Sequence, residues 1–173
     1  MDRAEALRRV AALNFTTWTG EAFRHVAVNF DPLSGAGSRL TGGRWNPKGL
    51  FGAVYLAEPQ DACLAEFRRM ALAQGLSASD FLPRAFYRIE VIGLAVLDLR
   101  SGESLTRAGL SERALALADW TDCQAVAEAA HLLGAQGIVA PSATGIGLVV
   151  AAFDDRLESR LVVRDLEVVA LAE

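Results

Sequence analysis

The stretch GGRWNPKGLFGAVYLAEPQDACLAE, residues 42–66, contains the most informative residues of the chain. It begins with two glycines, which allow close backbone approach or a positive φ. Arg44 then offers a guanidinium fork suited to phosphate, and Trp45 offers a surface on which a ring can stack. The Asn-Pro pair that follows favours a turn. This pattern predicts either a ligand-binding loop or a loop that Trp45 anchors to the core.

A strand over 53–57 and a helix over 59–72 are expected to follow this loop. Tyr55 lies on the strand, where a core position is the default. Glu66 lies on a helix face that is otherwise apolar. The other residues expected on that inward face are Pro59, Ala62, Cys63, Phe67 and Met70. The residues expected on the opposite face are Gln60, Asp61, Arg68 and Arg69. A carboxylate among apolar residues is unfavourable unless it is paired. Glu66 is therefore either part of a structural ion pair, at the edge of the apolar stripe, or an active-site acid.

Arg24 and His25 pose a similar question on a strand expected over 22–28. Side chains alternate between the two faces of a strand, so one of the two must point towards an apolar layer. A buried arginine requires a carboxylate or a phosphate, both of which match its rigid fork. The alternative is an edge strand with Arg24 in solvent.

Two segments further along the chain combine polar with small or aromatic residues. The first, APSATG, places Ser142 in a loop after an expected strand, which is a common place for ligand contacts and also an ordinary turn. It lacks the G-x-S-x-G pattern of a hydrolase nucleophile. The second, WTDCQ, places Gln124 near a helix start. The face that Gln124 shares with Glu128 and His131 is expected to be mostly solvated.

The 173 residues are expected to form one domain, residues 1–173, with an N-terminal helix over 2–13. Further strands are expected over 86–92, 95–99, 137–140, 147–153 and 161–171. A helix is expected over 122–135, with Asp122 as its N-cap and Gly137 beyond its end. Helices and strands mix without regular βαβ alternation, so the expected fold class is α+β.

The composition excludes several kinds of protein. A hydrophobic fraction of 52% is typical of a folded domain rather than a disordered chain. The formal net charge of −4 argues against direct nucleic-acid binding. The two cysteines and two histidines have no metal-ligand spacing, and the cysteines suit a reducing compartment. No signal peptide is evident, and the most apolar stretch, 146–153, is too short to span a membrane, so a cytoplasmic location is expected.

Taken together and in order, these segments resemble the RES-domain family of bacterial toxins, which is named for an Arg, a Glu and a Ser. The matching residues are Arg24 in AFRHV, Glu66 in ACLAEFRRM and Ser142 in APSATG. The stretch quoted above resembles the family's Gly-Arg-Trp-Asn loop, its Tyr-bearing strand and its Glu helix. The resemblance covers a core of about 22–171. His25 stands where relatives often have an aromatic residue.

The resemblance implies an ADP-ribosyltransferase-like fold, with a mixed sheet core and flanking helices. It implies NAD as the substrate and cleavage of the nicotinamide–ribose bond; no metal is expected, because the cysteines and histidines lack a metal-ligand spacing. The acceptor in the family is water, inorganic phosphate or a protein side chain. The implied partner is an Xre-type antitoxin that occludes the active site, with a possible homodimer inside the toxin–antitoxin complex. Leu33 and Phe51 are candidates for an exposed apolar rim that meets this partner.

Roles for the candidate residues follow from this chemistry. Glu66, with Arg24, is the expected catalytic residue, because a fixed carboxylate stabilises an oxocarbenium-like ribose. Arg24 and Arg44 are expected to hold the pyrophosphate, and Tyr55 the nicotinamide ring. The expected NAD-binding residues are Arg44, Tyr55, Ser142, His25, Trp45 and Gln124. Ser142 would form a hydrogen bond with the ribose or with the nicotinamide amide group. Lys48 and Arg39 are candidates for an additional phosphate contact.

Two alternatives remain open at this point. The same site can support transfer of ADP-ribose to a protein. The chain can also be a non-catalytic interaction module of the same fold, in which case Glu66 and Arg24 would form a structural salt bridge.

Overall fold

Six strands form one strongly curved sheet in the order β1-β2-β5-β4-β3-β6, and β1 also pairs with β3. The computed structural model describes residues 1–169. The strands are β1 (Phe15–Ala27), β2 (Ala53–Glu58), β3 (Arg84–Asp98), β4 (Gly137–Pro141), β5 (Leu148–Phe153) and β6 (Leu161–Val169). The second pairing of β1 closes five of the strands into a barrel-like core. Only β3 and β4 run parallel among the recorded strand pairs.

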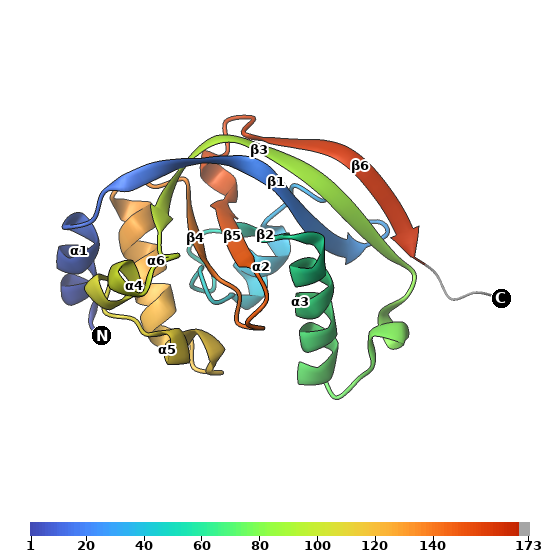
Figure 1. Ribbon diagram of the computed structural model, residues 1–173, viewed down its shortest axis with the longest axis horizontal. Coiled ribbons are helices and arrows are strands. Elements are labelled where there is room, and N and C mark those ends of the chain that lie inside the picture. The colour runs from blue at the N-terminus through green and yellow to red at the C-terminus, as the bar shows by residue number, and fades with distance from the viewer. Residues whose placement is uncertain (170–173) are drawn as a thin grey trace.

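The helices flank this sheet on two sides. They are α1 (Arg3–Ala11), α2 (Ala36–Thr41), α3 (Gln60–Ala73), η1 (Ala78–Phe81), α4 (Gly102–Arg107), α5 (Glu112–Ala116), α6 (Thr121–Leu132) and η2 (Asp154–Arg156). Figure 1 shows β1, β3 and β6 as a long arch, with α1, α4, α5 and α6 at one end and α3 at the other. The α+β class with a mixed sheet and flanking helices is confirmed.

The two short apolar strands, β4 and β5, lie at the centre of the sheet. β5 pairs with β2 on one side and β4 on the other. Its side chains alternate between two core clusters, so Val149 and Phe153 pack towards α6, and Val150 packs on the other face. Both faces of β5 are therefore buried.

The long strands differ from the expected pattern. One strand, β3, replaces the two expected over 86–92 and 95–99. Gly93, with φ of 61°, lies between the half of β3 that pairs with β6 and the half that pairs with β4. A glycine accepts this conformation without strain, so the chain bends there without leaving the sheet. β1 likewise begins at Phe15, seven residues before the expected start.

The ends of two expected elements also need correction. Trp120, not Asp122, is the N-cap of α6, and Asp122 instead accepts a hydrogen bond from the Met1 ammonium. Gly134, with φ of 97°, follows the helix end, whereas Gly137 already belongs to β4. The last two residues of the strand expected over 161–171 lie outside the described residues.

A small apolar cluster packs the first turns of helix α3 against the sheet. Ala62 and Cys63 pack there against Ala57 of β2, with Phe23 of β1 and Phe86 of β3 at the edge. The inward face predicted for this helix is confirmed at Ala62, Cys63 and Phe67, all of which are buried. Within residues 1–169, no helix is long and apolar enough to cross a membrane.

Candidate active site

A cavity of about 610 Å³ lies between α3, the end of β1, the 42–45 loop and the start of α6. Its lining includes one carboxylate, Glu66, and four arginines, Arg24, Arg44, Arg69 and Arg84. Aromatic residues at its wall are Phe23, Trp45, Tyr55 and Trp120. A concave site of this size with a few polar groups is suited to a small-molecule ligand, and the excess of arginine favours an anionic one.

Glu66 is fixed by the loop that follows β4. The Ser142 hydroxyl donates a hydrogen bond to Glu66 Oε1 at 2.7 Å, across 76 residues of sequence. Thr144 lies 2.7 Å from the same hydroxyl and completes the chain by donating to Ser142 Oγ. Ser142 is 5% exposed, while the Glu66 side chain is 25% exposed. The structure therefore brings two of the three family residues into contact, and Ser142 orients the carboxylate.

Arg24 lies on β1, and only one of its two terminal guanidinium nitrogens has a hydrogen-bond partner. Its Nη2 donates to the Ser34 carbonyl at 2.9 Å, but Nη1 is buried without a partner. Burial lowers the pKa of the guanidinium to about 10, which still leaves it charged at neutral pH. The ion pair of Glu66 is with Arg69, at 3.7 Å, so the Arg24–Glu66 salt bridge expected of a non-catalytic module is not formed.

His25, the next residue, packs among aromatic rings. Its ring lies 4.8 Å from Phe67 and 5.9 Å from Phe86, measured between centroids. Arg84 Nε donates to His25 Nδ1 at 3.1 Å. Burial lowers the pKa of His25 to about 3, helped by the charges of Arg84 and Arg24. The imidazole is therefore neutral, with its proton on Nε2.

The 42–45 loop is held by buried hydrogen bonds. Tyr55 Oη accepts from the Trp45 backbone N–H at 2.8 Å and donates to Asn46 Oδ1 at 2.9 Å. Asn46 is fully buried and donates to the carbonyls of Ser38 and Phe51. Burial raises the pKa of the Tyr55 hydroxyl above its usual range. Tyr55 thus has two parts, a hydroxyl that shapes the loop and a half-buried ring at the cavity wall.

Trp45 and Gln124 also support this loop. Trp45 is 1% exposed and packs in the main core, so the anchoring interpretation describes its ring better than an open stacking surface does. Gln124 Nε2 donates to the Gly43 carbonyl at 2.9 Å. The prediction of a mostly solvated face is wrong, because Gln124 and Glu128 are half-buried and His131 stacks on Phe51 at 4.2 Å.

Replacing Tyr55 with phenylalanine is expected to lower the free energy of unfolding by about 1–3 kcal/mol, because two polar groups lose a buried partner. The aromatic ring stays, so ligand turnover should fall much less than stability. Urea unfolding followed by circular dichroism measures the change. Tyr87→Phe removes the only other tyrosine hydroxyl and should change stability by less than about 0.5 kcal/mol. Equal losses in the two variants would contradict a loop-shaping role for the Tyr55 hydroxyl.

Arg44, in the same loop, is held by backbone carbonyls within and just after α5. Its Nη1 donates to the carbonyls of Ala114 and Leu117 at 3.4 and 3.2 Å. Its guanidinium lies 5.6 Å from the centroid of the Trp120 ring. Its Nη2 is buried without a partner, as is Trp120 Nε1. Arg44 therefore lines the cavity with one donor that has no hydrogen-bond partner, and its role as a phosphate-binding arginine stays a prediction.

Two arginines and a tryptophan of the cavity, Arg69, Arg84 and Trp120, lie outside the candidates named from sequence. Arg69 was expected on the far face of its helix, but it lines the cavity with Glu66, three residues earlier. That spacing places two side chains on one helix face and was the available signal. The β1–β3 register places Arg84 opposite Ala27, at the end of β1. Trp120 is the N-cap of α6 and lines the cavity there. Arg84 left no local signal that assigns it to the site, whereas Trp120 begins the WTDCQ segment noted from the sequence.

Lys48 and Arg39 do not line the cavity. Lys48 is exposed, and Arg39 donates to the Leu50 carbonyl on the surface. Within residues 1–169, no three His, Cys, Asp or Glu side chains form a cluster that could hold a metal ion.

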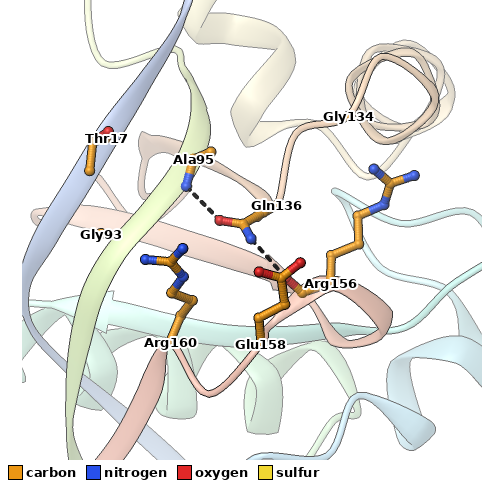
Figure 2. A pocket seen from close by; sticks show the side chains of 8 residues that line it. All are labelled: Thr17, Gly93, Ala95, Gly134, Gln136, Arg156, Glu158 and Arg160. Carbon is orange, nitrogen blue, oxygen red and sulfur yellow. Dashed lines mark hydrogen bonds between the residues drawn. The ribbon is translucent and has the colours of Figure 1, made fainter.

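A second hollow of about 590 Å³ lies at the turn between β5 and β6 (Figure 2). Its residues are Thr17, Gly93, Ala95, Gly134, Gln136, Arg156, Glu158 and Arg160. The Gln136 side chain links β3 to the segment after β5, because it accepts a hydrogen bond from the Ala95 N–H and donates one to the Arg156 carbonyl. None of the lining residues is aromatic, and Glu158 lies between the two arginines in Figure 2. The cavity around Glu66 is the better candidate site.

A sequence profile of the RES domain matches residues 17–170. The chain belongs to the RES domain family. NAD(+) phosphorylase MbcT from Mycobacterium tuberculosis H37Rv is 40% identical over 152 residues, which cover 87% of this chain and 82% of that protein. The protein of the same name from Mycobacterium bovis matches with the same values.

A solved structure supports the RES domain assignment. The crystal structure of the M. tuberculosis MbcT–MbcA toxin–antitoxin complex contains a chain that matches with a TM-score of 0.89 and 37% identity. The match covers 96% of this chain and 92% of that chain. The α+β architecture described above is thus shared with a RES domain relative.

Proposed function

We propose that this chain is an NAD-degrading toxin that cleaves the nicotinamide–ribose bond, with inorganic phosphate as the acceptor. The observation that carries the proposal is the Glu66 carboxylate, fixed by Ser142 at the wall of a cavity that contains four arginines. The similar proteins named NAD(+) phosphorylase support the same substrate and acceptor.

Glu66 is suited to stabilise the positive charge that develops when this bond breaks. In the reaction, the bond between ribose C1′ and the nicotinamide nitrogen breaks, and its electron pair leaves with nicotinamide. The ribose then has oxocarbenium-like character, as in glycoside hydrolysis. A carboxylate already oriented by Ser142 stabilises this charge without reorganisation. A phosphate oxygen forms the new bond to C1′, which gives ADP-ribose 1-phosphate.

The rest of NAD is matched by groups with unused binding capacity. Arg24 Nη1 is a buried donor without a partner and is suited to the pyrophosphate. The Tyr55 ring at the cavity wall is suited to the nicotinamide ring. His25, Trp45 and Gln124 act behind these groups, by packing or by holding the loop.

We propose an antitoxin of the Xre type as the partner, covering this cavity in the bacterial cytoplasm. The MbcT relative was solved as a toxin–antitoxin complex. The rim candidates named from sequence need correction, because Phe51 is 2% exposed and Leu33 packs partly against the core. Leu40 of α2 and Leu117 after α5 are exposed and adjoin residues of the cavity.

Product analysis tests the proposed reaction. The purified chain is incubated with NAD, with and without inorganic phosphate, and the products are identified by mass. ADP-ribose 1-phosphate that appears only with phosphate is the expected result. Free ADP-ribose in both conditions would mean a hydrolase, and ADP-ribose attached to lysate proteins would mean a transferase. Intact NAD in every condition would overturn the proposal and leave a binding module.

A further inference from the structure

Unpartnered donors are concentrated at the candidate site. Within residues 1–169, three buried side-chain nitrogens have no hydrogen-bond partner, Arg24 Nη1, Arg44 Nη2 and Trp120 Nε1. All three residues line the Glu66 cavity. A buried donor left without a partner destabilises a protein by about 1–3 kcal/mol, so such groups in a site indicate a ligand that satisfies them.

Two of these donors, Arg44 Nη2 and Trp120 Nε1, belong to side chains on the same wall of the cavity. Arg44 lies over the Trp120 ring, and its Nη1 is already committed to carbonyls after and within α5. Arg44 Nη2 and Trp120 Nε1 belong to neighbouring side chains that both line the cavity, and the Cys123 thiol lies close to the Arg44 guanidinium. Arg24 lies elsewhere, on β1, where Ser34 holds the other half of its fork.

Arg69 adds a second positive charge to this wall. Burial lowers the pKa of Arg44 below its usual value, and the nearby charge of Arg69 lowers it further. Two guanidinium groups close enough to repel each other in a half-buried site are unfavourable without an anion between them. Arg69 Nη1 is also 3.7 Å from Glu66 Oε2, so this wall reaches the carboxylate at the reacting centre.

We propose that Arg44, Arg69 and Trp120 form the subsite that binds the acceptor, inorganic phosphate, separately from the NAD pyrophosphate. The inference rests on the proposed function and adds the residues that select the acceptor. A tetrahedral dianion has several acceptor oxygens, so it can take both arginine donors and the indole N–H at once. One remaining oxygen is then free to attack C1′ beside Glu66. Phosphate on Arg69 also draws that guanidinium away from Glu66 Oε2, which leaves the carboxylate to face the ribose.

The test compares Trp120→Phe and Arg69→Gln with Arg68→Gln, a change at the adjacent, exposed position of α3. Trp120→Phe removes one N–H donor and keeps an aromatic ring, and Arg69→Gln is the second variant should the first fail to fold. Both are expected to raise the KM for phosphate by about tenfold or more, while the KM for NAD changes less than about threefold. Arg68→Gln should leave both constants near wild type.

A binding measurement without NAD separates this inference from the proposed reaction. Millimolar phosphate alone should raise the melting temperature of the wild type and of Arg68→Gln, but not that of Trp120→Phe or Arg69→Gln. If no protein degrades NAD but this pattern holds, the proposed reaction fails and the phosphate subsite stands. A rise in the KM for NAD with an unchanged KM for phosphate would overturn the inference, since the wall would then hold the NAD pyrophosphate.

Discussion

Replacing Glu66 with glutamine is expected to lower NAD turnover by about 10³-fold or more, because an oriented negative charge is lost at the ribose cation. The protein should stay folded. Glutamine keeps an oxygen that can accept the hydrogen bond from Ser142, and the lost ion pair with Arg69 is partly exposed. Such a pair contributes about 0–1 kcal/mol. Stopped assays of nicotinamide release give the rate, and urea unfolding gives the stability.

Asp61→Asn is the matched control for this variant. Asp61 is exposed on the same helix, so its amide should leave turnover near wild type. Ser142→Ala adds a second comparison, since it frees the Glu66 carboxylate to rotate without removing its charge. An intermediate loss of turnover is expected there. Turnover of Glu66→Gln within about threefold of the wild type would mean that Glu66 is only structural, and the cleavage chemistry would have to be sought elsewhere.

The second large effect is expected at Arg24. Arg24→Met should lower kcat/KM for NAD by about 10- to 100-fold, the value of one or two charge-assisted hydrogen bonds to a phosphate. The same change removes a buried charge that has only the Ser34 carbonyl as a partner. The unliganded protein should therefore be as stable as the wild type or more stable. Steady-state kinetics and urea unfolding measure the two effects.

Arg24→Lys refines this result, because lysine keeps the charge and loses the planar fork. It should recover only part of the lost affinity. Arg88→Met is the control, since Arg88 pairs with Glu21 on the surface. A large loss of stability in Arg24→Met with an unchanged KM for NAD would show that Arg24 supports the fold instead of the ligand.

Local pattern was enough to place the main elements that carry the site. The spacing of apolar residues around Glu66 predicted α3 and its inward face, since the helical period fixes which side chains share a face. The apolar runs predicted the strands β4 and β5. The order of the Arg24, Glu66 and Ser142 segments indicated the RES domain family, which the profile match confirms.

Errors arose where a side chain's role depends on distant partners. Arg69 was assigned to the far face of α3, although it lies three residues after Glu66, a spacing that places two side chains on one helix face. Phe51 was expected at the rim, but the stacking of His131 and the edge of Phe153 enclose it. The start of α6 was misplaced because Asp122, the expected N-cap, instead binds the Met1 ammonium.

The sequence by itself determined the main elements around the site, the fold class and the residue types that a nucleotide-cleaving site requires, because periodicity and turn chemistry are local. Only the tertiary structure decided which of those residues meet. Closure of the sheet by the β1–β3 pairing brings Arg84 to His25, and the β4–β5 loop brings Ser142 to Glu66. These contacts join segments up to 76 residues apart. Their geometry depends on strand order and register, which no local pattern encodes.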